Sequence, residues 1–335
     1  MAETTGPSWS DIPLDLAGRI LRRLPAHIDR LRFSAVCPQW RAAARRTPVH
    51  PPLPLLLLPD ATAYSFPGSE PFHFAGCEGY TDACGNWLVF SGEDACFLKD
   101  PFTDTTVTLP ALSRRRVLHV GGANSWWFML VDHQAPLFVD IIYHQGKLYA
   151  FDMDALFAVD ISTDHSTGDP WVSQIQQVIG GLPEPVRYEG IDLMVPYLVE
   201  SCGALLLVCR RRGIYIWSTP EQGDALAPEQ DRFEVFEANF GQSRWAKVTT
   251  LGDDRVLFLR RRCCRSVCVS HDEVPGDCIL VLDNEYEDYY PFCKGVSLSC
   301  SVYNMRNGKV STESTPLSTV SWKQDMVWAT WLLPS

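Results

Sequence analysis

Residues 9–46 read WSDIPLDLAGRILRRLPAHIDRLRFSAVCPQWRAAARR, and this stretch decides how the chain is organised. Its start carries the signals of a helix N-terminus. Ser10 or Asp11 is expected to cap the first turn, and Pro13 suits the first helical position. Apolar residues then recur at helical spacing and predict one apolar stripe, made of Leu16, Ile20, Leu21 and Leu24.

Two further helices follow in the same stretch. Pro25 ends the first helix, and a second helical pattern runs from Ile28 to Val36. Pro38 breaks this pattern and predicts a third helix, in which Trp40 faces inward. Three helices in fewer than forty residues cannot bury all of this apolar surface by themselves. The sequence therefore predicts an apolar helical surface that meets another protein.

These residues resemble an F-box. The usual pattern is Leu-Pro-x-Asp/Glu-Leu, a helix that ends near Leu-Pro, an apolar helix, and then Val-Cys-x-x-Trp-Arg. The matching segments in this chain are Ile12-Pro13-Leu14-Asp15-Leu16, Leu24-Pro25, Leu31-Arg32-Phe33 and Val36-Cys37-Pro38-Gln39-Trp40-Arg41. The one departure, Ile12 in place of Leu, conserves side-chain volume. An ordinary helical subdomain is the competing interpretation.

The F-box resemblance implies a role in protein degradation. F-box proteins are substrate receptors of SCF-type cullin-RING ubiquitin ligases, in which the F-box docks on a Skp-family adaptor. We therefore expect an F-box domain over residues 8–46. The residues expected to contact the adaptor, or to support those contacts, are Ile12, Pro13, Leu16, Ile20, Leu21, Leu24, Leu31, Val36, Cys37 and Trp40.

The composition excludes several classes of protein. Of 335 residues, 46% are apolar, which excludes global disorder. The first 20 residues show no secretory signal, and the longest apolar run, Leu53 to Leu58, is too short to span a bilayer. We expect a soluble intracellular protein of the cytoplasm, the nucleus or both, with no membrane partner. The 12 cysteines show no regular spacing, so reduced thiols are expected.

Charge divides the chain into two parts. The formal net charge is −11. The first 50 residues hold eight Arg against four acidic residues, which gives +4, so the remainder carries −15. An acidic body argues against nucleic-acid binding, which requires charge that neutralises phosphates. A basic head on an acidic body suits a modular protein whose parts face different partners.

The remainder of the chain predicts β structure. Residues 47–54 hold four prolines and indicate a stiff linker. From residue 55 to 335, short apolar runs rich in β-branched and aromatic residues alternate with turn residues. A propeller blade takes about 40 to 50 residues, so six or seven blades fit this length. The fold class is therefore an α+β multidomain chain, with a small three-helix F-box followed by an all-β propeller.

The C-terminal part resembles plant F-box proteins with a KIB-type β-propeller. Two early matches are Trp87-Leu88-Val89 and the turn Asp100-Pro101-Phe102-Thr103, which leads to Leu109-Pro110. Asp100 stands where the family has Asn. The last strand, within residues 328–334, resembles the first, within residues 53–59. We expect both to lie in one blade and to close the ring, which removes exposed sheet edges.

Three clusters could carry chemistry. Cys263, Cys264, Cys268, His271 and Cys278 have irregular spacing for zinc, so packed thiols are favoured. An acidic run at 283–288 lacks the glycine of a calcium loop and is typical of a solvated loop. We find no catalytic set and expect neither a metal nor another cofactor, so the chain is expected to be a non-catalytic subunit.

Arginine triplets are the candidate target contacts. Arg210, Arg211 and Arg212 follow an apolar strand, as do Arg260, Arg261 and Arg262, 50 residues later. A face shared by both triplets would suit an acidic or phosphorylated peptide, and solvated strand ends are the alternative. Two other functions stay open: a propeller that binds a ligand or acts as an enzyme, and an F-box scaffold that does not promote ubiquitination.

Overall fold

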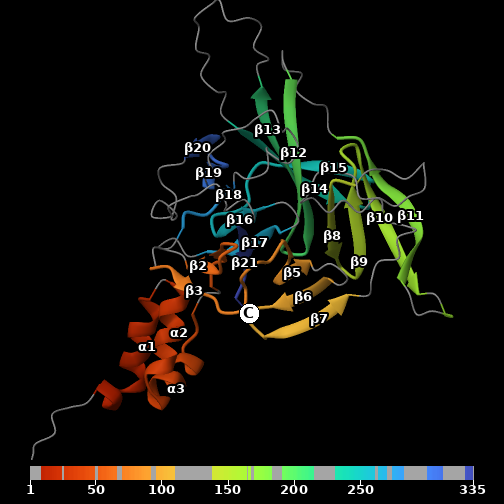
Figure 1. The fold of residues 1–335 in the computed structure, drawn as a ribbon. Helices are drawn as coiled ribbons and strands as arrows, with labels where there is room; N and C mark the ends of the chain where they lie inside the picture. Colours follow the sequence, from red (N-terminus) through yellow and green to blue (C-terminus); the bar gives the residue numbers. More distant parts are fainter. Residues whose placement is uncertain are drawn as a thin grey trace, which may run out of the picture.

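The structure is a computed structural model, and it describes residues 9–24, 26–49, 52–65, 70–91, 96–109, 138–163, 165–166, 170–182, 191–214, 231–260, 263–269, 274–282, 300–311 and 329–334. A helical lobe comes first, and β-sheets make up the rest of the described chain. Figure 1 shows the lobe at one side of the sheets, next to β2 and β3.

The N-terminal lobe consists of one 3-10 turn and three α-helices. Their bounds are η1 Trp9–Asp11, α1 Leu14–Arg22, α2 His27–Val36 and α3 Pro38–Arg46. The predicted second and third helices are confirmed. The predicted capping of the first is wrong in detail. Pro13 is itself the N-cap residue, and no side chain caps α1, because Asp11 lies in the preceding turn.

The described strands form five sheets, and each sheet is built mainly from consecutive antiparallel strands. The first sheet holds β1 Leu55–Leu57, β2 Thr62–Tyr64, β3 Phe72–His73 and β21 Thr330–Leu332. The second holds β4 Asp82–Cys84, β5 Trp87–Ser91, β6 Cys96–Asp100 and β7 Thr105–Leu109. The third holds β8 Asp140–His144, β9 Lys147–Phe151, β10 Ala155–Thr163 and β11 Pro170–Gly180.

Two longer sheets complete the described propeller. One holds β12 Ile191–Ser201, β13 Ala204–Ile214, β14 Arg232–Asn239 and β15 Arg244–Val248. The other has five strands in the order β17-β16-β18-β19-β20, with bounds β16 Arg255–Leu259, β17 Arg265–Cys268, β18 Cys278–Leu282, β19 Cys300–Asn304 and β20 Lys309–Ser311. Its β16 and β18 run parallel, whereas its other pairs are antiparallel.

The predicted propeller is confirmed, but the described residues form five blades and not six or seven. The length estimate assumed about 40 to 50 residues per blade. The two long sheets span residues 191–248 and 255–311, so each takes more than that. In addition, β12 and β13 are 11 residues long, twice the usual strand length. Longer blades therefore account for part of the overestimate, within the part of the chain that is described.

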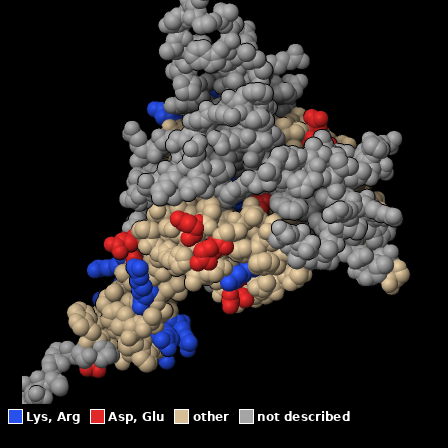
Figure 2. Space-filling model, in the orientation of Figure 1, with Lys and Arg blue, Asp and Glu red and all other residues tan. Residues whose placement is uncertain are grey.

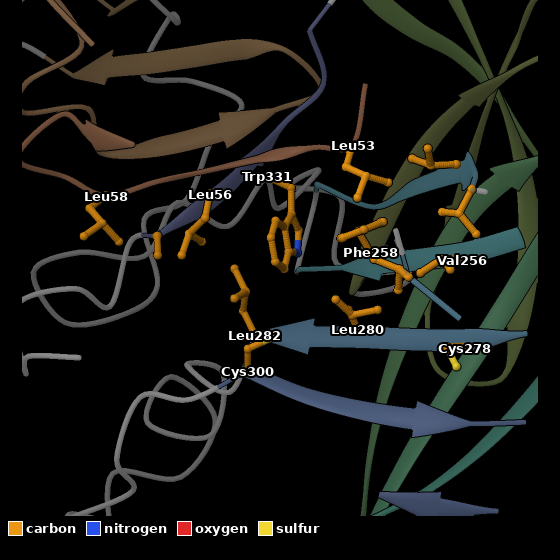
Figure 3. Close-up of a cluster of buried hydrophobic side chains, with 14 residues drawn as sticks. Leu53, Leu56, Leu58, Val256, Phe258, Cys278, Leu280, Leu282, Cys300 and Trp331 are labelled. Atoms are coloured by element: carbon orange, nitrogen blue, oxygen red, sulfur yellow. The ribbon is translucent and has the colours of Figure 1, made fainter. Parts of the chain in front are cut away.

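The first and last strands share one blade, as predicted. β21 pairs with β1 in antiparallel register, with Leu55 opposite Leu332 and Leu57 opposite Thr330. Between these pairs lies Trp331, which is fully buried. Figure 3 shows Trp331 between Leu56 of β1 and Phe258 of β16, inside a core that also holds Leu280. The first and last strands of the propeller are therefore joined inside one hydrophobic core.

A short contact connects the helical lobe with the first blade. The backbone N–H of Ile28, at the start of α2, donates to Oγ of Ser65, which follows β2, at 3.4 Å. Leu53, inside the predicted linker, belongs to the buried core that contains Trp331. The linker is thus anchored in the propeller at its C-terminal end. Among the described residues, no helix has the length and apolar character needed to cross a bilayer.

Candidate functional site: an apolar surface on the helical lobe

Three large apolar side chains on the α-helices of the lobe face solvent. Leu16 of α1 is 44% exposed, Leu31 of α2 is 49% exposed, and Val36 at the end of α2 is 60% exposed. All three belong to the set expected to contact the adaptor. An exposed apolar residue is ordinary when it stands alone, but several on one small lobe are typical of an interaction surface.

Other members of the predicted set support this surface from inside. Leu21 is buried in the core of the lobe together with Ala17, Phe33 and Ala43. The remaining partly buried apolar contacts to that core include Ile12, Ile20, Leu24 and Trp40. The Trp40 ring lies on the Phe33 ring, with centroids 4.5 Å apart. The structure therefore separates the predicted set into surface residues and core residues, which helical spacing alone does not separate.

Polar contacts hold the three helices in register. The Sγ of Cys37 accepts a hydrogen bond from the backbone N–H of Trp40 at 3.4 Å, so Cys37 caps α3. The side chain of Gln39 donates to the carbonyl of Ile12 at 2.8 Å, which ties α3 to the chain before α1. The indole N–H of Trp40 donates to the carbonyl of Trp9 at 3.1 Å. The predicted residues Cys37 and Trp40 thus have defined positions in the lobe.

Sequence reasoning did not single out two residues that shape this lobe. Phe33 is the buried aromatic side chain of its core, and the F-box pattern was its only signal. Trp9 is 72% exposed, and its signal was its position at the start of the motif. Exposed arginines surround the lobe on all three helices, and Figure 2 shows Lys and Arg side chains gathered there. The predicted basic head is therefore a basic surface.

Arg210 and Arg260, the first residues of the two arginine triplets, lie inside the propeller. Arg210 lies in β13 and Arg260 follows β16, and each strand is the second from the corresponding edge of its sheet. Arg210 is fully buried, and its guanidinium pairs with the carboxylate of Asp231. Arg211 lies 3.3 Å from the carboxylate of Glu234.

Arg260 is also internal. Its guanidinium donates to Oγ1 of Thr330 at 3.4 Å and lies 3.6 Å from a carboxylate oxygen of Asp82. A role for Arg210 and Arg260 as surface contacts is therefore corrected: buried ion pairs fix both inside the propeller. The side chain of Arg212 and both Arg261 and Arg262 lie outside the described part of the chain, so their role as target contacts stays a prediction.

The cysteine cluster does not form a metal-binding group in the described residues. No set of three or more metal-ligating side chains occurs among them, and His271 of the predicted cluster is not described. Cys263 is buried and donates to the carbonyl of Trp331 at 3.2 Å, whereas Cys278 lies in the hydrophobic core. Burial raises the pKa of Cys278 to about 11, which keeps its thiol protonated. The acidic run at 283–288 also falls outside the described ranges.

Comparisons with known proteins identify both parts of the chain. A sequence profile described as the F-box domain matches residues 9–51, the stretch that forms the helical lobe. A second profile, described as the KIB1-4 beta-propeller, matches residues 113–304, which is more than half of the chain. The chain is an F-box protein of the KIB1-4 β-propeller family.

Curated relatives of this F-box protein come from Arabidopsis thaliana. It is 25% identical to F-box protein At2g26160 over 159 residues, which is 46% of this chain and 42% of the relative. It is 31% identical to F-box protein At1g10110 over 117 residues, which is 32% of this chain and 29% of that relative. The matched regions therefore span less than half the length of each relative. The predicted resemblance to plant F-box proteins of the KIB type is confirmed.

Proposed function

We propose that this F-box protein is the substrate-recognition subunit of an SCF-type cullin-RING ubiquitin ligase. In this role the helical lobe binds a Skp-family adaptor, and the propeller binds a target protein. The observation that carries the proposal is the exposure of Leu16, Leu31 and Val36 on a lobe whose core is otherwise closed. A lobe of three short helices gains stability when such residues become buried against a partner.

The division of the predicted residues supports this assignment. Leu16, Leu31 and Val36 are available to a partner, whereas Leu21 and Phe33 hold the helices that present them. Apolar residues at the centre of an interface dominate its binding energy, and the charged rim contributes mainly to the association rate. The surrounding arginines therefore suit an adaptor surface that carries acidic residues around an apolar centre.

The propeller would act by holding its target near the ubiquitin-conjugating enzyme. The gain in rate then comes from effective concentration, since the chemistry belongs to other subunits of the ligase. The junction between lobe and propeller suits this task, because the Ile28 to Ser65 hydrogen bond and the buried Leu53 restrict how the lobe sits on the first blade. In this role the chain itself is a non-catalytic subunit.

Co-purification with a Skp-family adaptor tests the proposal. The full-length protein would be captured with the purified adaptor, alongside the double variant Leu16→Ala/Leu31→Ala. Both side chains lie outside the lobe core, so the variant is expected to fold. The loss of about 2 kcal/mol of apolar contact should weaken adaptor binding about 30-fold.

Ile161→Ala is the matched control. Ile161 is an exposed apolar residue of β10, in the propeller, and its truncation should leave adaptor binding unchanged. Equal adaptor binding by the wild type and the double variant would contradict the assignment of Leu16 and Leu31 to the adaptor-binding surface. Adaptor binding that never leads to ubiquitination of a bound target would favour the scaffold alternative.

A further inference from the structure

The hairpin between β8 and β9 carries a buried histidine with an unsatisfied ring nitrogen. His144 is the last residue of β8 and is only 2% exposed. Its Nδ1 makes no hydrogen bond to any residue that the structure describes. The nearest carboxylate oxygen, Oε2 of Glu200, lies 3.5 Å away, which is longer than a hydrogen bond. A buried polar atom without a partner is rare and requires an explanation.

Glu200 offers an exposed carboxylate beside this histidine. Its side chain is 49% exposed, and it lies near the end of β12, in the next blade. Among the described residues, no Lys or Arg forms an ion pair with Glu200, and His144 is its one charge neighbour. The position therefore combines an unneutralised carboxylate with an unsatisfied imidazole nitrogen.

Phe240 adds an aromatic ring to the same place. Its ring stacks on the ring of His144, with centroids 6.4 Å apart, and contacts the ring of Tyr149 at 5.1 Å. Phe240 nevertheless stays 39% exposed, at the turn between β14 and β15. Anchoring of the turn explains the two ring contacts, but it does not explain the exposed carboxylate or the unsatisfied nitrogen nearby.

The turns at or next to these groups are fixed by hydrogen bonds. In the turn of Phe240, the Asn239 side chain accepts from the backbone N–H of Gln242 at 3.0 Å, and Arg244 donates to the Gln242 side chain at 2.7 Å. The side chain of Gln145 donates to the carbonyl of Gly203 at 2.8 Å, which joins the β8–β9 turn to the β12–β13 turn. The three groups are therefore held in place before any partner arrives.

The two exposed groups complement one kind of side chain. The half-exposed carboxylate of Glu200 accepts hydrogen bonds, and the partly exposed ring of Phe240 attracts a cation, whereas His144, which neighbours both, is buried. What this place lacks is a cation with several donors. A guanidinium supplies donors in a planar fork that fits a carboxylate and stacks on an aromatic ring.

We propose that Glu200 and Phe240, next to the buried His144, form a binding site for an arginine side chain of the target protein. The charge of the chain agrees with a basic partner, since the residues after position 50 carry −15 of net charge. Opposite charge on the target would speed its association with the propeller. This inference rests on the proposed role of the propeller in target binding and states the chemistry of that target.

The test uses the full-length protein bound to its adaptor and a fluorescein-labelled peptide as the probe. The peptide carries four arginines separated by Gly-Ser pairs, and a second peptide carries citrulline, which has the same shape without the charge. Fluorescence polarisation at physiological ionic strength should give at least tenfold tighter binding of the arginine peptide. Glu200→Gln and Phe240→Leu should each weaken that binding at least fivefold.

Two matched variants control for general charge and exposed aromatic area. Glu78 is exposed to the same degree as Glu200, but its carboxylate already contacts His73 at 2.8 Å. Phe97 is 37% exposed, close to the value for Phe240. Glu78→Gln and Phe97→Leu should leave binding of the arginine peptide unchanged.

The outcomes separate this site from the proposed function. Equal binding of the citrulline peptide, or equal losses in the control variants, would overturn the arginine site. Because Glu200 and Phe240 lie in the propeller, their variants should keep full adaptor binding. If the wild-type protein does not bind the adaptor, that result would instead count against the ligase role.

Discussion

The side-chain amide of Asn86 makes two hydrogen bonds to the backbone of Leu333. Its Nδ2 donates to the Leu333 carbonyl at 2.7 Å, and its Oδ1 accepts from the Leu333 N–H at 3.1 Å. Asn86 lies in the turn between β4 and β5, and Leu333 directly follows the last strand, β21. The amide therefore pairs with Leu333 as a neighbouring strand would, and it joins the end of the chain to the second blade.

Asn86→Ala should destabilise the propeller. The substitution leaves the N–H and carbonyl of Leu333 without their side-chain partner, which costs about 1–3 kcal/mol. Urea unfolding followed by tryptophan fluorescence would measure the change. Asn307→Ala, at an exposed turn, is the control and should change stability by less than about 0.5 kcal/mol. An Asn86→Ala variant as stable as the wild type would show that the chain end is held by other contacts.

Trp331→Ala should cost more. Trp331 is fully buried, its ring packs edge-on against Phe258, and its indole N–H donates to the carbonyl of Leu259 at 3.2 Å. Truncation of a buried Trp typically costs about 3–5 kcal/mol. The exposed Trp9→Ala is the comparison and should have little effect on unfolding of the propeller.

Deletion of residues 327–335 extends this test to ring closure. Without β21, the first strand loses one of its two partner strands, and the sheet edge of β1 becomes exposed. We expect cooperative unfolding of the propeller, seen as loss of the near-ultraviolet circular dichroism signal. A truncated protein that stays soluble and fully folded would contradict the role of β21 in closing the ring.

The ion pair between Arg210 and Asp231 makes a prediction about the first arginine triplet. Asp231→Asn leaves the buried Arg210 guanidinium without its counter-charge, and loss of one partner of a buried pair costs about 3–5 kcal/mol. The double variant Arg210→Met/Asp231→Leu removes both charges and should recover most of that loss. Glu234→Gln, which weakens more exposed pairs, should cost about 1 kcal/mol or less.

A target-binding role for Arg210 gives a different result. In that case Arg210→Met/Asp231→Leu would fold like the wild type and lose its target. Chemical denaturation combined with target capture distinguishes the two outcomes. We expect the stability effect without a loss of target binding.

Buried thiols predict a loss of stability at high pH. Burial raises the pKa of Cys77 and Cys278 to about 11 and that of Cys209 to about 12, from an ordinary value of 9.0. Above pH 9 the unfolded chain loses these protons, whereas the folded chain keeps them until about pH 11. The free energy of unfolding should therefore fall by about 1 kcal/mol per thiol between pH 8 and pH 10.

Urea midpoints at the two pH values measure this effect. Cys209→Ala removes one buried thiol, so the fall in the free energy of unfolding between pH 8 and pH 10 should become about 1 kcal/mol smaller. Cys202→Ala is the control, because Cys202 is exposed and its removal should leave the pH dependence unchanged. An unchanged urea midpoint between pH 8 and pH 10 in the wild type would contradict the assigned burial.

Local sequence signals predicted a large part of the architecture. Proline positions and apolar spacing indicated the second and third helices, and the short apolar runs after residue 55 indicated β structure that includes β5 and β9. The pairing of the first and last strands could be predicted because both segments are apolar and bounded by proline. In each case the information lies within a few residues of the element.

Long-range contacts could not be predicted in the same way. Arg210 looks like a solvated strand end in the sequence, because its partner Asp231 lies 21 residues later and no local signal connects the two. His144 and Glu200 lie near the ends of strands in two blades, Phe240 lies in a turn, and no spacing connects the three. Leu21 and Leu31 have the same chemistry, and only the packing of three helices makes one buried and the other exposed.

Hydrogen exchange of the full-length protein, with and without a Skp-family adaptor, is the most direct test of the central claim. The account predicts that the adaptor slows amide exchange in α1 and α2, around Leu16, Leu31 and Val36, and leaves β12 to β15 unchanged. Protection of the propeller in place of the helices, or no protection of the folded protein at saturating adaptor, would contradict it.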